Sequence, residues 1–80
     1  MTINKVRELY EARPFRPFTI HLADGRNVRV EHPEFIAFAP TGRAMNVFEP
    51  DGSFHMIDAW LVTDLYVKAN GSSRGKRKSK

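Results

Sequence analysis

The sequence predicts a mostly β fold, in which a short N-terminal helix precedes five strands that form a strongly bent antiparallel open barrel of SH3-like type. Apolar and polar residues alternate between Phe18 and Val30, which is typical of strands with one buried face. Turn signals rich in Pro, Gly and Asp recur roughly every 10 to 17 residues, which is typical of a meander. The length of 80 residues limits the chain to one small domain.

A short helix is predicted from Ile3 to about Ala12. Thr2 can cap its start. One face carries the apolar residues at helical spacing, namely Ile3, Val6, Leu9 and Tyr10. Because so short a helix is not stable alone, we expect it to pack on the sheet.

The segment from Arg13 to Phe18 has the sequence RPFRPF, whose two prolines favour extended geometry. Two interpretations remain open. In the first, the segment is a stiff connector whose Phe15 and Phe18 fix the helix to the sheet. In the second, Arg13, Phe15 and Arg16 form an exposed patch for a protein partner.

The first two strands form a hairpin across Asp24-Gly25, a pair that supplies the positive φ of a tight turn. His32-Pro33 then interrupts the second strand, because Pro33 cannot donate to a β-ladder. We expect a bend or bulge there, with pairing resumed from Phe35 to Phe38. A strand bent in its middle curls a small sheet into a barrel.

The later strands are separated by turns at Pro40-Thr41-Gly42 and Pro50-Asp51-Gly52. A single tight turn is predicted at Asp58-Ala59-Trp60. The strands are predicted at Ala44 to Phe48, Ser53 to Ile57 and Leu61 to Val67. The last strand is expected to contribute Val62, Leu65 and Val67 to the core.

The formal charge of +4 is unevenly distributed. Residues 1–68, the predicted domain, carry eight Lys/Arg and all nine Asp/Glu. Residues 69–80 are predicted to be a disordered basic tail, since they contain no large apolar residue. The tail could hold a phosphate backbone or an acidic surface, or serve only solubility. Its cations are Arg74, Lys76, Arg77, Lys78 and Lys80.

Catalytic and metal-binding patterns are absent from the sequence. The chain has no cysteine, and its three histidines do not follow a metal-ligand spacing. It has no Gly-rich phosphate loop and no nucleophile placed beside a base. We therefore expect a protein that is not an enzyme, with no metal, cofactor or small-molecule substrate. No apolar run approaches the roughly 20 residues of a membrane span, so we expect a cytoplasmic protein.

Three segments resemble the Sm-like (Lsm/Hfq-type) superfamily of small β-barrels. The opening of the first Sm motif, a strand followed by Asp-Gly or Asn-Gly, is similar to FTIHLADGR. The Met-Asn-Leu that closes that motif resembles Met45-Asn46-Val47, and the second motif resembles the segment from Ile57 to Val67. A small bacterial protein family without an assigned function also shows a pattern similar to RPFRPFTIHLADGR and HPEF.

The resemblance implies a homo-oligomeric ring that binds U- or A-rich single-stranded RNA. In such a ring the fourth strand of one subunit pairs with the fifth strand of the next. A meander also leaves strand edges open on physical grounds alone. The expected interface residues are Phe54, Met56, Ile57, Val62, Leu65 and Tyr66. The expected RNA-binding residues are Asn46, Arg43 and Trp60, together with the cations of the tail.

The chain departs from the family pattern at the positions where basic or acidic groups are expected. Gly42 replaces an acidic residue, and Asp58-Ala59 replaces an Arg-Gly pair. A Trp between Ala59 and Leu61 is more often a core or interface residue than a base-stacking platform. The alternative function is therefore a protein-interaction or assembly module that does not bind nucleic acid.

Overall fold

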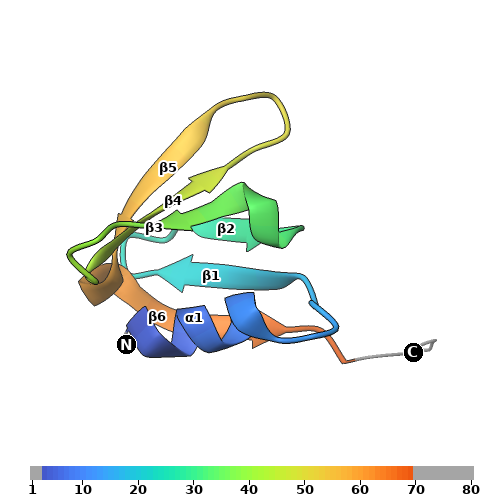
Figure 1. The fold of residues 1–80 in the computed structure, drawn as a ribbon. Coiled ribbons are helices and arrows are strands. Elements are labelled where there is room, and N and C mark those ends of the chain that lie inside the picture. Colours follow the sequence, from blue (N-terminus) through green and yellow to red (C-terminus); the bar gives the residue numbers. More distant parts are fainter. Residues whose placement is uncertain (1–2, 70–80) are drawn as a thin grey trace.

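The computed structural model of the protein describes residues 3–69. Over this range a single α-helix and two short 3₁₀ helices accompany six strands, so the predicted mostly β fold with an N-terminal helix is confirmed. The elements in chain order are α1 (Ile3–Glu11), β1 (Phe18–Leu22), β2 (Asn27–Val30), η1 (Pro33–Phe35), β3 (Ile36–Phe38), β4 (Ala44–Phe48), β5 (Phe54–Asp58), η2 (Ala59–Leu61) and β6 (Val62–Val67) (Figure 1).

The strands form two antiparallel three-stranded sheets. Sheet A has the order β2-β1-β6, and sheet B has the order β3-β4-β5. In sheet A, Ile20 on the central strand β1 pairs with Val28 on β2 and with Leu65 on β6. In sheet B the hairpin of β4 and β5 rises away from the other strands toward its turn (Figure 1). The two sheets are not closed into a barrel within residues 3–69.

The structure has six strands where the sequence predicted five, because the expected bent strand is interrupted. Its two halves are β2 and β3, which belong to different sheets. Pro33 begins the 3₁₀ helix η1 between them, and the amide of Phe35 donates to the carbonyl of His32 at 3.0 Å. Pro33 has no N–H of its own to continue a ladder, which explains why the strand breaks at this point.

The three predicted turns occur where the sequence places them. At the first, Gly25 has a φ of 95°, a conformation that favours glycine, and its amide donates to the carbonyl of Leu22 at 3.0 Å. At the third, the amide of Gly52 donates to the carbonyl of Glu49 at 3.0 Å. The predicted tight turn after β5 is η2, and the Asp58 side chain accepts from the amide of Trp60 at its start.

The core lies between the inner faces of both sheets. The most deeply buried side chains come from α1 and from the alternating inward positions of the strands. Of the three core positions predicted on the last strand, Val62 is buried, whereas Leu65 and Val67 are only partly buried. The buried cluster consists of Val6, Phe18, Ile20, Leu22, Val28, Val30, Ile36, Met45, Val47, Ile57 and Val62.

Helix α1 is held to the strands by aromatic contacts as well as by the buried Val6. The Tyr10 ring meets the Phe38 ring edge to face, with 5.3 Å between centroids. The Arg7 guanidinium lies 4.4 Å from the centroid of the same Phe38 ring. The Phe15 ring packs on Phe18 at 6.0 Å, which agrees with the interpretation of this segment as a connector that fixes the helix to the sheet.

Candidate interaction surface

The exposed large apolar side chains of the described residues are concentrated in one region of the chain. Five of them lie between residues 54 and 66, on β5, η2 and β6, and the sixth, Phe48, packs on Phe54 with 5.6 Å between ring centroids. The most exposed are Trp60 at 76% and Met56 at 73%. Phe48, Phe54 and Met56 share the outer face of sheet B, and contiguous exposed apolar patches mark interaction sites more often than single exposed apolar residues do. The other members are Phe54, Leu61 and Tyr66.

The same segment carries two open strand edges. Strand β5 pairs only with β4, and strand β6 pairs only with β1, so one side of β5 and one side of β6 after Val62 have no ladder partner within residues 3–69. The other two edges are β2 and β3, of four and three residues, and the Phe38 ring on β3 contacts Tyr10 and Arg7. An uncovered edge offers unpaired N–H and C=O groups to another chain. We call β5, η2 and β6 together the open-edge segment.

The predicted interface residues divide into two groups in the structure. Phe54, Met56 and Tyr66 are exposed on the open-edge segment, as an interface requires. Ile57 and Val62 are 1% and 2% exposed and belong to the core. Their side chains already pack in the core and are not available to a neighbouring chain. Leu65 is partly buried.

Asp58 connects two of the predicted RNA-binding residues. Its Oδ1 accepts from the backbone amide of Trp60 at 2.9 Å, and its Oδ2 lies 3.5 Å from Nη2 of Arg43. The arginine charge is therefore matched by a carboxylate at this position. The Trp60 side chain is exposed, and its backbone amide donates to the same carboxylate that pairs with Arg43.

Asn46 lies in the middle of β4, on the outer face of sheet B. Its ladder partners are Ala37 on β3 and Met56 on β5. The outward neighbours along β4 are Ala44, which pairs with Asp58, and the exposed Phe48. The amide of Asn46 is thus a polar group on a largely apolar face, next to the open edge of β5.

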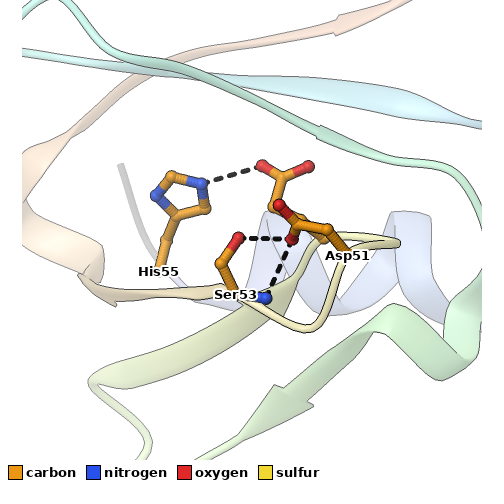
Figure 2. Close-up of polar contacts among 4 residues, drawn as sticks. Asp51, Ser53 and His55 are labelled. Carbon is orange, nitrogen blue, oxygen red and sulfur yellow. Dashed lines mark hydrogen bonds and ion pairs between the residues drawn. The ribbon is translucent and has the colours of Figure 1, made fainter.

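The turn between β4 and β5 holds the densest group of polar contacts (Figure 2). His55 Nε2 lies 2.8 Å from Oε2 of Glu49. Ser53 donates to Oδ1 of Asp51 twice, from its hydroxyl at 2.7 Å and from its amide at 2.9 Å. The hydroxyl bond, followed by the amide bond, holds the pKa of Asp51 below its ordinary value. Glu49 lies opposite Ser53, and His55 pairs with Val47, so the Glu49–His55 contact is a diagonal one across the hairpin. Side chains in this diagonal position remain within reach of each other, which is the signal that the sequence offered.

These contacts brace a turn and do not align a nucleophile with a base. Nucleophilic catalysis requires the serine hydroxyl to donate to the histidine, which a third group then orients. Here the hydroxyl of Ser53 donates to Asp51, while the imidazole of His55 contacts a different carboxylate. Each group has its own partner, so the arrangement fixes the shape of the hairpin tip.

The predicted partner patch is partly engaged within the subunit. Arg13 donates to the carbonyls of Tyr10 and Ala12, at 3.1 and 2.8 Å. Arg16 donates to the carbonyl of Lys68. The predicted basic tail, with its five cations, lies outside the described residues.

Within the described residues, no group of three or more His, Cys, Asp or Glu is placed to hold a metal ion. Over the same range of the chain, no helix has the length and apolar character needed to span a membrane. No protein-family model, curated protein or solved structure matches the chain significantly. Functional inference therefore depends on the surfaces described above.

Proposed function

We propose that this protein is a non-enzymatic, cytoplasmic assembly module of Sm-like type, which forms a homo-oligomeric ring. Strand β5 of one subunit pairs with β6 of the next. The observation that carries the proposal is that one segment holds two of the four sheet edges and five of the six exposed large apolar side chains of residues 3–69. The proposed occupant of each edge is a second copy of this chain, because the two edges differ and can complement one another.

The order of the strands supports the Sm-like aspect of the proposal. A five-stranded meander whose second strand is bent has the order 5-1-2 in one half and 2-3-4 in the other. The observed orders β6-β1-β2 and β3-β4-β5 follow this scheme when β2, η1 and β3 are taken as the single bent strand. In this scheme β5 and β6 are the two free ends of the meander.

Pairing between unlike edges determines the form of the assembly. A contact between β5 of one copy and β6 of the next is heterologous, and a heterologous contact closes into a ring or continues as a filament. The η2 turn reverses the chain between the two edges, so each subunit presents one edge to each neighbour. Phe54 and Met56 accompany the first edge, and Tyr66 accompanies the second.

The mass of the particle in solution tests this proposal. Multi-angle light scattering at tens of micromolar should give a multiple of the 9.2 kDa chain mass. Met56→Lys with Tyr66→Lys should reduce it to a single chain, because lysine on an open edge opposes pairing. Asn27→Lys on β2, which is separated from β6 by the central strand β1, is the matched control and should leave the oligomer intact. A monomeric wild-type protein would contradict the proposal.

Binding of single-stranded RNA by the assembled protein is the second candidate function. The observation that favours it is the exposed side chain of Trp60, since exposed aromatic rings stack on unpaired bases. Asp58 accepts from the Trp60 amide and pairs with Arg43, so both residues are bonded to one carboxylate. A titration with poly-U and poly-A should then show weaker binding for Trp60→Ala and Asn46→Ala. Unchanged affinity in both variants would leave an assembly module that does not use this surface for RNA.

A further inference from the structure

Three cations from distant regions of the sequence surround a hollow beside sheet A. The hollow has a volume of about 280 Å³, and its charged lining residues are Arg16, Arg29 and Lys68. Arg16 comes from the connector after α1, Arg29 from β2, and Lys68 from the residue after β6. We call this feature the basic hollow. Its remaining lining residues are Phe15, Pro17 and Ala69.

The cations of the basic hollow are incompletely neutralised. Arg29 pairs with Glu31. Arg16 contacts the carbonyl of Lys68, and within residues 3–69 neither Arg16 nor Lys68 has a carboxylate within 4.0 Å. One carboxylate therefore faces three cations. Two arginines outside the basic hollow each have a carboxylate partner of their own. Arg26 pairs with Asp24 at 2.9 Å, and Arg43 pairs with Asp58 at 3.5 Å.

The hollow combines this charge with an apolar wall. Phe15 is half-buried, and its ring packs on Phe18, which fixes its position relative to β1. A cationic groove with an aromatic side chain is the combination that binds single-stranded nucleic acids, because the cations contact phosphates while the ring stacks on a base. The acidic side chains of a peptide would use the cations but carry no aromatic ring to stack on Phe15.

The sequence that follows extends the positive charge. Ala69 lines the hollow, and the five cations of the tail begin at Arg74.

We propose that the basic hollow binds the phosphate backbone of a single-stranded nucleic acid, with a base placed against Phe15. Arg16 and Lys68 contact successive phosphates, and Arg29 supports them. The proposal does not depend on ring formation, because all three cations belong to one subunit. It also uses a different surface from Arg43, Asn46 and Trp60.

Fluorescence anisotropy of a labelled 16-nucleotide oligo-U with the full-length protein tests this inference. Removing two phosphate contacts from a single strand makes the negative slope of log K against log salt shallower by about 1.4. At 0.1 M salt this change corresponds to roughly 25-fold weaker binding. We expect this loss for Arg16→Gln/Lys68→Gln. The matched control is Lys5→Gln/Arg26→Gln, which removes two cations that already face carboxylates and should change the affinity less than about twofold.

Two further arms separate the hollow from the tail and from other ligands. With the five tail cations replaced by Ser in the full-length chain, weaker binding should remain, and Arg16→Gln/Lys68→Gln should abolish it. Phe15→Leu should cost at least about fivefold, from the roughly 1 kcal/mol of one stacked base. Three results would each overturn the proposal. The first is an equal loss of affinity in Arg16→Gln/Lys68→Gln and in the control Lys5→Gln/Arg26→Gln. The others are complete loss of binding when only the tail cations are replaced, and displacement of the RNA by polyglutamate as efficiently as by poly-U.

Discussion

The two sheets have the same construction but very different outer faces. Each has three antiparallel strands, and each contributes its inward residues to one core. On the outer face of sheet A, polar neighbours satisfy each other, as in the 2.7 Å contact between His21 Nδ1 and Asn27 Oδ1. On the outer face of sheet B, Phe48, Phe54 and Met56 are exposed. The outer face of sheet B is thus the more apolar of the two, and on sheet A the exposed large apolar residue is Tyr66 on the edge strand β6.

The largest expected effects come from the shared core, where the two sheets should behave alike. Ile20 on β1 and Ile57 on β5 are 0% and 1% exposed. Truncation of either to Ala should lower the free energy of unfolding by about 2–5 kcal/mol, because each leaves a cavity. Urea denaturation measures both. A cost below about 1 kcal/mol for Ile57→Ala alone would mean that sheet B does not share the core of sheet A.

Smaller effects should distinguish the outer faces. The Phe48–Phe54 pair of sheet B should show a coupling energy of about 0.5–1 kcal/mol in a double-mutant cycle with Leu at both positions. The His21–Asn27 pair of sheet A should show less than about 0.5 kcal/mol with Ala at both positions, since water competes for its surface hydrogen bond. A larger coupling energy for His21–Asn27 than for Phe48–Phe54 would contradict the proposed distinction between the two outer faces.

The smallest expected effect is the pH dependence of the stability that the turn carboxylates contribute. This dependence should have the same sign for the turn of sheet A and the turn of sheet B. Hydrogen bonds from Ser53 lower the pKa of Asp51, and the amide of Arg26 does the same most strongly for Asp24. A lowered folded-state pKa gives stability that is complete above the ordinary value of 3.8 and is lost as the pH falls through the folded value.

Asp51→Ala and Asp24→Ala should therefore destabilise the protein slightly at pH 7. Both differences from wild type should shrink on acidification toward about pH 2.5, where the carboxylates become protonated. Denaturation midpoints at the two pH values measure this change. A difference that grows as the pH falls would show that the turn carboxylates do not act through these hydrogen bonds.

Local signals in the sequence are sufficient for most of the fold. The Asp24-Gly25 pair and the Pro50-Asp51-Gly52 segment predict their turns because positive φ favours glycine, and both glycines have it. The alternation from Phe18 predicts the buried face of β1. Pro33 predicts a break, but the sequence does not show that η1 divides the strand between two sheets, because that depends on the packing of β3 against β4.

The candidate surfaces are less predictable, because they depend on which side of a strand faces inward and on contacts between distant segments. The sequence predicts Ile57 and Val62 at an interface together with Phe54 and Met56, but the first two side chains are buried. The basic hollow has no local signature at all. Its three cations are separated by 13 and 39 positions, and only the folded chain brings them together.

Cross-linking between copies of the chain tests the central claim most directly, because the protein contains no cysteine and any disulfide must come from the introduced residues. Chains carrying Met56→Cys should be mixed with chains carrying Tyr66→Cys and oxidised, with Asp64→Cys as a second position on β6. Pairing of β5 with β6 predicts a cross-linked dimer from a mixture and none from either chain alone, since a disulfide requires Cα atoms within about 7 Å. A dimer formed by Met56→Cys alone, or no cross-link in any mixture, would contradict the proposed assembly.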